Sequence, residues 1–104
     1  MALIEEIQRK IRSGEFEFSK HAVDQSILRG IGVAELQQAI ASGEIIEDYT
    51  ADKYGPSCLI FGFTLKKRPL HIQYSYPSRT LLKVITLYEP DPARWIDYRT
   101  RRSP

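Results

Sequence analysis

The sequence predicts an α+β domain in which three N-terminal helices precede a four-stranded, mainly antiparallel sheet and a short C-terminal helix ends the chain. Two observations predict this order. Apolar residues recur at helical spacing up to about residue 42, and runs rich in β-branched and aromatic residues follow from residue 45 onward. The length of 104 residues fits one domain, residues 1–104, with the helices packed on one face of the sheet.

The three helices are expected at residues 2–13, 20–29 and 33–42. In the first, Leu3, Ile7 and Ile11 follow one another every four residues, which places them on one helix face. Ser19 is a favourable N-cap for the second helix, and Gly30 stands just past its end. Both ends of the second helix are therefore marked in the sequence.

Four strands are expected at residues 45–50, 57–65, 69–76 and 80–88. The connections 66–68 and 77–79 are short enough for antiparallel hairpins. Residues 92–101 are expected to form the terminal helix, because a proline stands in its first turn, and Trp95 is expected to anchor this segment on the sheet. The period-2 pattern of the strands predicts three apolar residues that face the helices, namely Leu70, Ile72 and Ile85.

Composition excludes several classes of protein. Apolar residues make up 42% and charged residues 27%, as in an ordinary globular domain, and no apolar run approaches the ~20 residues of a membrane span. The N-terminus lacks the pattern of a secretory signal, so a cytoplasmic location is expected. The single cysteine, Cys58, rules out an internal disulfide and a Cys-rich zinc site. We expect neither a metal nor a cofactor.

Charge is distributed unevenly along the chain. Residues 1–52 hold ten acids and five bases, whereas residues 53–104 hold ten bases and three acids. Such asymmetry is typical of a protein with a polyanion partner, and the alternative is a solvated turn with a basic tail. The basic side chains in the acid-free stretch are the expected nucleic-acid contacts: Lys66, Lys67, Arg68, Arg79 and Lys83.

A few polar residues have the side chains of an acid–base site. His71 lies on one expected strand and Thr86 and Tyr88 share a face of the next, while His21 and Arg29 follow a polar stripe of the second helix. Histidine suits proton transfer at neutral pH, and arginine stabilises charge on a phosphoryl oxygen. These are the parts of a metal-independent ribonuclease, in which a 2′-hydroxyl attacks the adjacent phosphate. Each residue also has an ordinary structural interpretation, as a helix-end or strand residue.

Several short motifs follow one another in a particular order, at residues 19–22, 29–31, 43–49, 56–62, 68–72 and 85–91, together with Trp95. In this order they resemble the small bacterial and archaeal proteins of the domain-of-unknown-function 4258 family. The resemblance runs from about Phe18 to Arg102 and leaves out the first expected helix.

The resemblance implies a fold like that of the RelE and BrnT toxins, which they share with metal-independent endoribonucleases. It also implies a partner, an antitoxin-like protein of the zinc-finger or helix-turn-helix type. The polar positions that match are His21, Arg29, His71, Thr86 and Tyr88. One position departs from the family: Gln25 stands where an arginine is frequent, which removes a cation from the expected site.

These observations predict a toxin of a type II toxin–antitoxin pair that cleaves RNA as an endoribonuclease. The alternative is a non-catalytic protein- or nucleic-acid-binding module that keeps the fold. The two hypotheses differ in one structural respect, because only an enzyme needs His21, His71 and Tyr88 to converge on one concave site.

Overall fold

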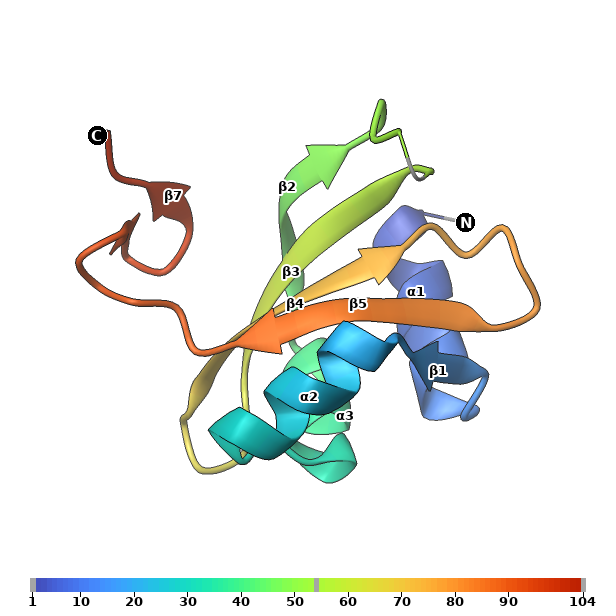
Figure 1. Ribbon diagram of the computed structural model, residues 1–104, viewed down its shortest axis with the longest axis horizontal. Helices are drawn as coiled ribbons and strands as arrows, with labels where there is room; N and C mark the ends of the chain where they lie inside the picture. Colours follow the sequence, from blue (N-terminus) through green and yellow to red (C-terminus); the bar gives the residue numbers. More distant parts are fainter. Residues whose placement is uncertain (1, 54, 104) are drawn as a thin grey trace.

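Three helices cover one face of a five-stranded sheet, and a small two-stranded sheet lies against the opposite face near the C-terminus (Figure 1). This is a computed structural model, and it describes residues 2–53 and 55–103. Within these ranges, no helix combines the length and the apolar character needed to cross a membrane. The mixed α+β class predicted from the sequence is confirmed.

The helices are α1 (Leu3–Arg12), α2 (Lys20–Arg29) and α3 (Val33–Ala41). The predicted ends of α2 are confirmed. The Ser19 hydroxyl accepts a hydrogen bond from the backbone N–H of Ala22 at 3.0 Å. Gly30 ends the helix with a φ of 62°, a left-handed conformation that glycine adopts without steric cost. Arg29 lies in the last turn of α2, directly before this glycine.

The main sheet has the strand order β1-β5-β4-β3-β2. Its strands are β1 (Phe16–Phe18), β2 (Glu44–Tyr49), β3 (Ser57–Phe63), β4 (Pro69–Ser75) and β5 (Leu82–Tyr88). The prediction of four strands is wrong, because β1 adds a fifth at the edge and pairs parallel to β5. A three-residue strand is too short to show a period in the sequence, and its pairing with β5 is what defines it.

The predicted terminal helix is also wrong. After a single turn at Asp91, the chain forms an antiparallel hairpin of β6 (Trp95–Ile96) and β7 (Thr100–Arg101). Asp97 and Tyr98 between these strands have positive φ angles of 52° and 63°, which a right-handed helix cannot contain. We call β6, β7 and the residues between them the C-terminal hairpin.

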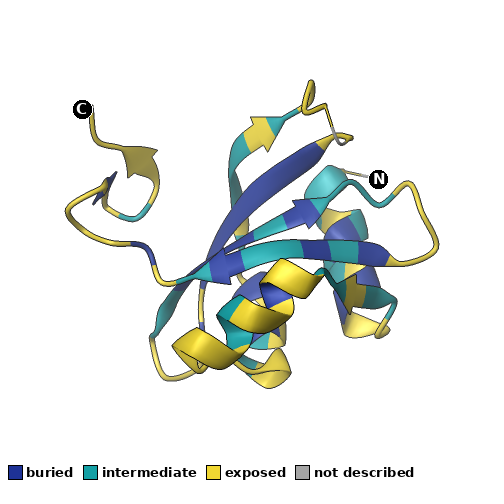
Figure 2. Cartoon of the chain, in the orientation of Figure 1, coloured by how far each residue is buried: buried dark blue, intermediate teal, exposed yellow. Residues whose placement is uncertain are grey.

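The core lies between the helices and the sheet, where buried residues concentrate (Figure 2). Leu70 and Ile72 face the helices as predicted, and both are at most 1% exposed. The same prediction for Ile85 is wrong. On β4, Gln73 pairs with Thr86 and the next residue pairs with Val84, so Ile85 is the extra residue of a β-bulge. Its side chain lines a pocket on the face away from the helices.

Candidate functional site

The site is built around His71 and Tyr88, which lie opposite each other on β4 and β5. Both side chains are on the sheet face away from the helices. The Nδ1 atom of His71 is 3.3 Å from the hydroxyl of Tyr88, and its Nε2 atom is 2.6 Å from the backbone carbonyl oxygen of Tyr98. His71 and Tyr88 are therefore in contact in the structure.

These two contacts define the protonation of the pair. A carbonyl oxygen can only accept, so Nε2 of His71 carries the proton and Nδ1 is the acceptor. The Tyr88 hydroxyl then donates to Nδ1, which leaves its oxygen lone pairs available to accept a hydrogen bond from a ligand. Burial lowers the pKa of His71, and this effect outweighs the hydrogen bond to Tyr98 and the nearby charge of Glu47. The imidazole is accordingly neutral at pH 7.

The C-terminal hairpin covers His71. The Trp95 ring stands edge-on to the imidazole, with ring centroids 4.4 Å apart, and the Tyr98 ring packs against Phe61 at 5.6 Å. As a result His71 is 0% exposed. The aromatic residues of the hairpin pack against the open face of the sheet and bury this imidazole.

Ion pairs tie the hairpin to strand β2. Arg101 donates from Nε to Glu47 at 2.8 Å, and its guanidinium lies over the Trp95 ring, 4.7 Å from the centroid. Burial raises the pKa of Glu47, but hydrogen bonds from Arg101 and Tyr49 outweigh it and hold that pKa below its usual value. Glu47 is therefore an ionised carboxylate whose charge favours a proton on His71.

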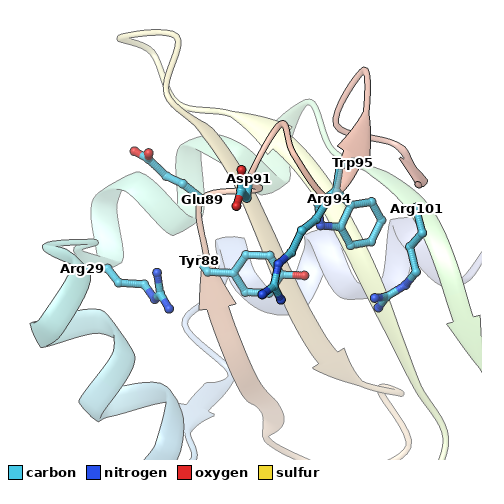
Figure 3. Close-up of a pocket in the computed structure, with 7 residues that line it drawn as sticks. All are labelled: Arg29, Tyr88, Glu89, Asp91, Arg94, Trp95 and Arg101. Carbon is cyan, nitrogen blue, oxygen red and sulfur yellow. The ribbon is translucent and has the colours of Figure 1, made fainter. Parts of the chain in front are cut away.

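Tyr88 also lines a pocket of about 490 Å³, which we call the Tyr88 pocket. Its walls come from the last turn of α2, the end of β5, the segment after β5 and the hairpin (Figure 3). The lining residues are Arg29, Tyr88, Glu89, Asp91, Arg94, Trp95 and Arg101. Figure 3 shows the Arg29 side chain extending from the helix toward Tyr88. The phenol at the end of β5 is thus surrounded by residues of α2, of the segment after β5 and of the C-terminal hairpin.

The Tyr88 pocket carries two arginines whose charge is not neutralised. Within the described residues, neither Arg29 nor Arg94 forms an ion pair, although Arg29 donates to the Gln25 side chain at 2.6 Å. The carboxylate of Glu89 is engaged by Arg68, and Asp91 accepts from a backbone N–H at 2.9 Å. A pocket with two such cations and a phenol is suited to bind an anion such as a phosphate group.

Arg68 holds this end of α2 in place. Its guanidinium donates to Glu35 and Glu89 and to the backbone carbonyl oxygens of Arg29 and Gly30, at 2.8 Å and 2.9 Å for the two carbonyls. Arg68 was expected to contact nucleic acid, but the structure engages its donors within the protein. Its role in the structure is to position the last turn of α2, and with it Arg29.

The other expected site residues lie apart from the Tyr88 pocket. His21 is exposed in the first turn of α2, about 12 Å along the helix axis from Arg29, and it does not line the pocket. Thr86 is half-buried on the open face of the sheet, where it pairs with Gln73 and stands two residues before Tyr88 on β5. The structure brings together Arg29, Tyr88 and, behind it, His71, so His21, His71 and Tyr88 do not converge on one concave site.

The expected cations fall into two groups. Lys66 and Lys67 lie in the turn between β3 and β4, at the end of the sheet where Tyr88 lies, whereas Arg79 and Lys83 lie at the opposite end. Lys83 forms an ion pair with Glu17 at 3.2 Å. The acid-free stretch of sequence therefore does not fold into one continuous basic patch.

Sequence reasoning missed Arg94 and Arg101, because they lie in a segment that was expected to be helical. The only signal for them was the basic character of the last residues of the chain. The role of Trp95 as an anchor was predicted, and the side chain is 4% exposed against the sheet.

Comparison with known protein families matches residues 18–89 to the family described as Domain of unknown function (DUF4258). This match confirms the family resemblance and ends before the C-terminal hairpin. No curated protein and no solved structure matches the chain. The toxin-like resemblance and the activity stay predictions.

Proposed function

Because the chain belongs to the DUF4258 family, whose description names no activity, we propose a function from the chemistry of the Tyr88 pocket. The protein binds a phosphate group of RNA there and cleaves the chain without a metal ion, as the toxin of a type II toxin–antitoxin pair. One observation carries this proposal: a phenol hydrogen-bonded to a buried, neutral imidazole faces a pocket that holds two arginines with no ion pair among the described residues.

The proton-transfer group in this proposal is the Tyr88–His71 pair. Burial raises the pKa of Tyr88, so the phenol keeps its proton at neutral pH and acts as a relay rather than as a phenolate. His71 is the final acceptor, since its Nδ1 atom already receives the phenolic hydrogen bond. Glu47 stabilises the imidazolium that forms.

In the cleavage step, the 2′ oxygen attacks the adjacent phosphorus and the bond from phosphorus to the 5′ oxygen breaks. The proton of the 2′-hydroxyl moves to the Tyr88 oxygen as the phenolic proton moves to His71. The 5′ oxygen takes a proton from water, and the imidazolium returns its proton, by way of Tyr88, to the hydroxide so formed. The products are a 2′,3′-cyclic phosphate and a 5′-hydroxyl. Arg29 and Arg94 stabilise the charge that develops on the phosphoryl oxygens.

The test compares RNA cleavage by the wild type and Tyr88→Phe, with products identified by mass spectrometry. Acid–base catalysis contributes about 10²–10⁴-fold, and Tyr88→Phe is expected to lose roughly that factor. Tyr98→Phe is the matched control, because it removes a hydroxyl from the hairpin and keeps the carbonyl that holds His71. If the wild type leaves RNA intact, or if Tyr88→Phe cleaves at the wild-type rate, the enzyme hypothesis is wrong.

A non-catalytic binding module is the second candidate, and one observation favours it. Ile27 and Leu28 are 76% and 75% exposed, next to Arg29 at the rim of the pocket. Apolar side chains with this exposure suit a protein partner, which we propose to be antitoxin-like. A partner bound there would cover the Tyr88 pocket. RNA or partner binding without any cleavage by the wild type would favour this second function.

A further inference from the structure

A second pocket, of about 440 Å³, lies at the opposite end of the same sheet face, and we call it the Ile85 pocket. Its floor is formed by Gln73 and Ser75 of β4 and by Ile85 of β5. The loop before β3 contributes Asp52, Gly55 and Pro56 to its walls, and the loop after β4 contributes Tyr76, Ser78 and Arg79. Nothing in the proposed function uses this pocket.

The β-bulge of β5 explains the apolar floor of the Ile85 pocket. Regular alternation would place Ile85 on the helix side of the sheet, in the core. As the extra residue of the bulge, it lies half-buried on the open face instead, beside Gln73. An apolar side chain exposed in this way on a pocket floor offers a surface for the face of a ring.

The polar groups of the Ile85 pocket are held in place. The Gln73 amide nitrogen donates to the buried Ser57 hydroxyl at 3.0 Å, and its carbonyl oxygen has no partner among the described residues. The Tyr76 ring packs against the core on the helix side of the sheet, where its hydroxyl donates to Asp48. Arg79 is exposed and forms no ion pair within the part of the chain that the structure describes. The Ile85 pocket thus offers an apolar floor, a hydrogen-bond acceptor and a cation.

Both pockets border strand β5, one near each end. From Tyr88 to Lys83 the strand spans about 15 Å, with Thr86 and Gln73 half-buried on the open face between them. Positive charge lies at both ends, at Arg29 in the Tyr88 pocket and at Arg79 in the Ile85 pocket. An extended nucleic-acid strand with a phosphate in the Tyr88 pocket therefore reaches the Ile85 pocket a few nucleotides away.

We propose that the Ile85 pocket is a base-binding subsite for the RNA strand whose phosphate occupies the Tyr88 pocket, an inference that rests on the proposed function. One unstacked base lies on Ile85 and hydrogen-bonds Gln73, while Arg79 contacts the phosphate beside it. A base can enter only if it leaves a duplex, so the substrate class is single-stranded RNA.

The test measures the affinity of two RNA lengths by fluorescence anisotropy, in the Tyr88→Phe background so that the RNA stays intact. A dinucleotide reaches only the Tyr88 pocket, whereas a hexanucleotide spans both. Arg79→Glu is expected to weaken hexanucleotide binding about tenfold and to leave dinucleotide binding unchanged. Arg12→Glu on α1 is the matched control, because it makes the same charge change on the helix side of the sheet and is expected to affect neither length.

A direct measurement locates the base. In NMR spectra, the side-chain amide signals of Gln73 are expected to shift on addition of the hexanucleotide and not of the dinucleotide. If Arg79→Glu weakens the binding of both RNA lengths equally, or if the Gln73 amide signals do not shift, the proposal of a base-binding subsite is wrong.

The failures of the two proposals are distinguishable. If the wild type cleaves RNA but Arg79→Glu binds the hexanucleotide as tightly as its parent, the endoribonuclease hypothesis is supported and the base-binding subsite is wrong. If hexanucleotide binding depends on Gln73 and Arg79 but the wild type does not cleave RNA, the base-binding subsite is supported and the endoribonuclease hypothesis is wrong.

Discussion

At the scale of single residues, His71 connects the candidate site to the stability of the protein. Its ring is fully buried, and burial lowers its pKa in the folded state. In the unfolded chain the same imidazole titrates near pH 6.5. As pH falls through this value, the unfolded state takes up a proton before the folded state does, so stability decreases with decreasing pH.

The prediction from this linkage is a steeper acid destabilisation in the wild type than in His71→Gln. We expect the wild type to lose more thermal stability than the variant between about pH 7.5 and pH 5, measured as the difference in Tm between the two conditions. His21→Gln is the matched control, because His21 is exposed. A wild type and His71→Gln with parallel pH profiles would show that His71 does not contribute this linkage.

At the scale of elements, helix α3 packs in close contact with strand β3. A Cβ atom added at Gly62 would lie 1.9 Å from the carbonyl oxygen of Ala39. Only hydrogen fits between the two backbones there, so the absence of a side chain at Gly62 sets how closely α3 packs on the sheet.

We therefore expect Gly62→Ala to destabilise the protein by about 3 kcal/mol or more, because backbone atoms of α3 must move to relieve the overlap. Urea denaturation measures the change in free energy of unfolding. Gly32→Ala is the control, since an added Cβ there meets nothing within 4 Å. Similar losses in both variants would contradict the close contact of α3 with β3.

The hairpin of residues 95–101 shows how an element depends on what it packs against. Local sequence favours a helical turn after Pro92, and one such turn forms at Asp91. Trp95 and Tyr98 then gain more by packing on the aromatic and imidazole side chains of β3 and β4 than a short helix in solvent would gain. The same packing buries His71 and completes the Tyr88 pocket.

At the scale of the whole molecule, the distribution of charge determines how RNA binding responds to salt. If Arg29, Arg94 and Arg79 each neutralise one phosphate, log affinity is expected to fall with log salt concentration at a slope of about −2 for a single strand. The double variant Arg29→Ala/Arg94→Ala is expected to reduce this slope by roughly 1.4, as measured by anisotropy with the hexanucleotide.

The matched control for this experiment is Arg9→Ala/Arg12→Ala, which removes the same formal charge from α1 on the helix side of the sheet. Its slope is expected to equal that of the wild type. Equal slopes in all three proteins would mean that the arginines of the Tyr88 pocket do not contact phosphate.

The helices, four of the five strands of the main sheet and the core residues Leu70 and Ile72 follow from the sequence, because they depend on local periodicity and on capping residues such as Ser19 and Gly30. The alternation of β4 and β5 leaves both Tyr88 and Thr86 as candidates for the neighbour of His71, and the strand register, which only the structure shows, selects Tyr88. The match of residues 18–89 to DUF4258 also depends on the sequence alone.

The tertiary structure alone decided the bulge at Ile85, the short strand β1, the hairpin over His71 and the engagement of Arg68 within the protein. Each of these depends on contacts between residues far apart in the chain. Local periodicity carries no information about such contacts, because the free energy that decides them comes from burial and hydrogen bonds formed only after the helices and the sheet have packed. The pocket that joins Arg29, Tyr88 and Arg94 exists for that reason, and no spacing in the sequence marks it.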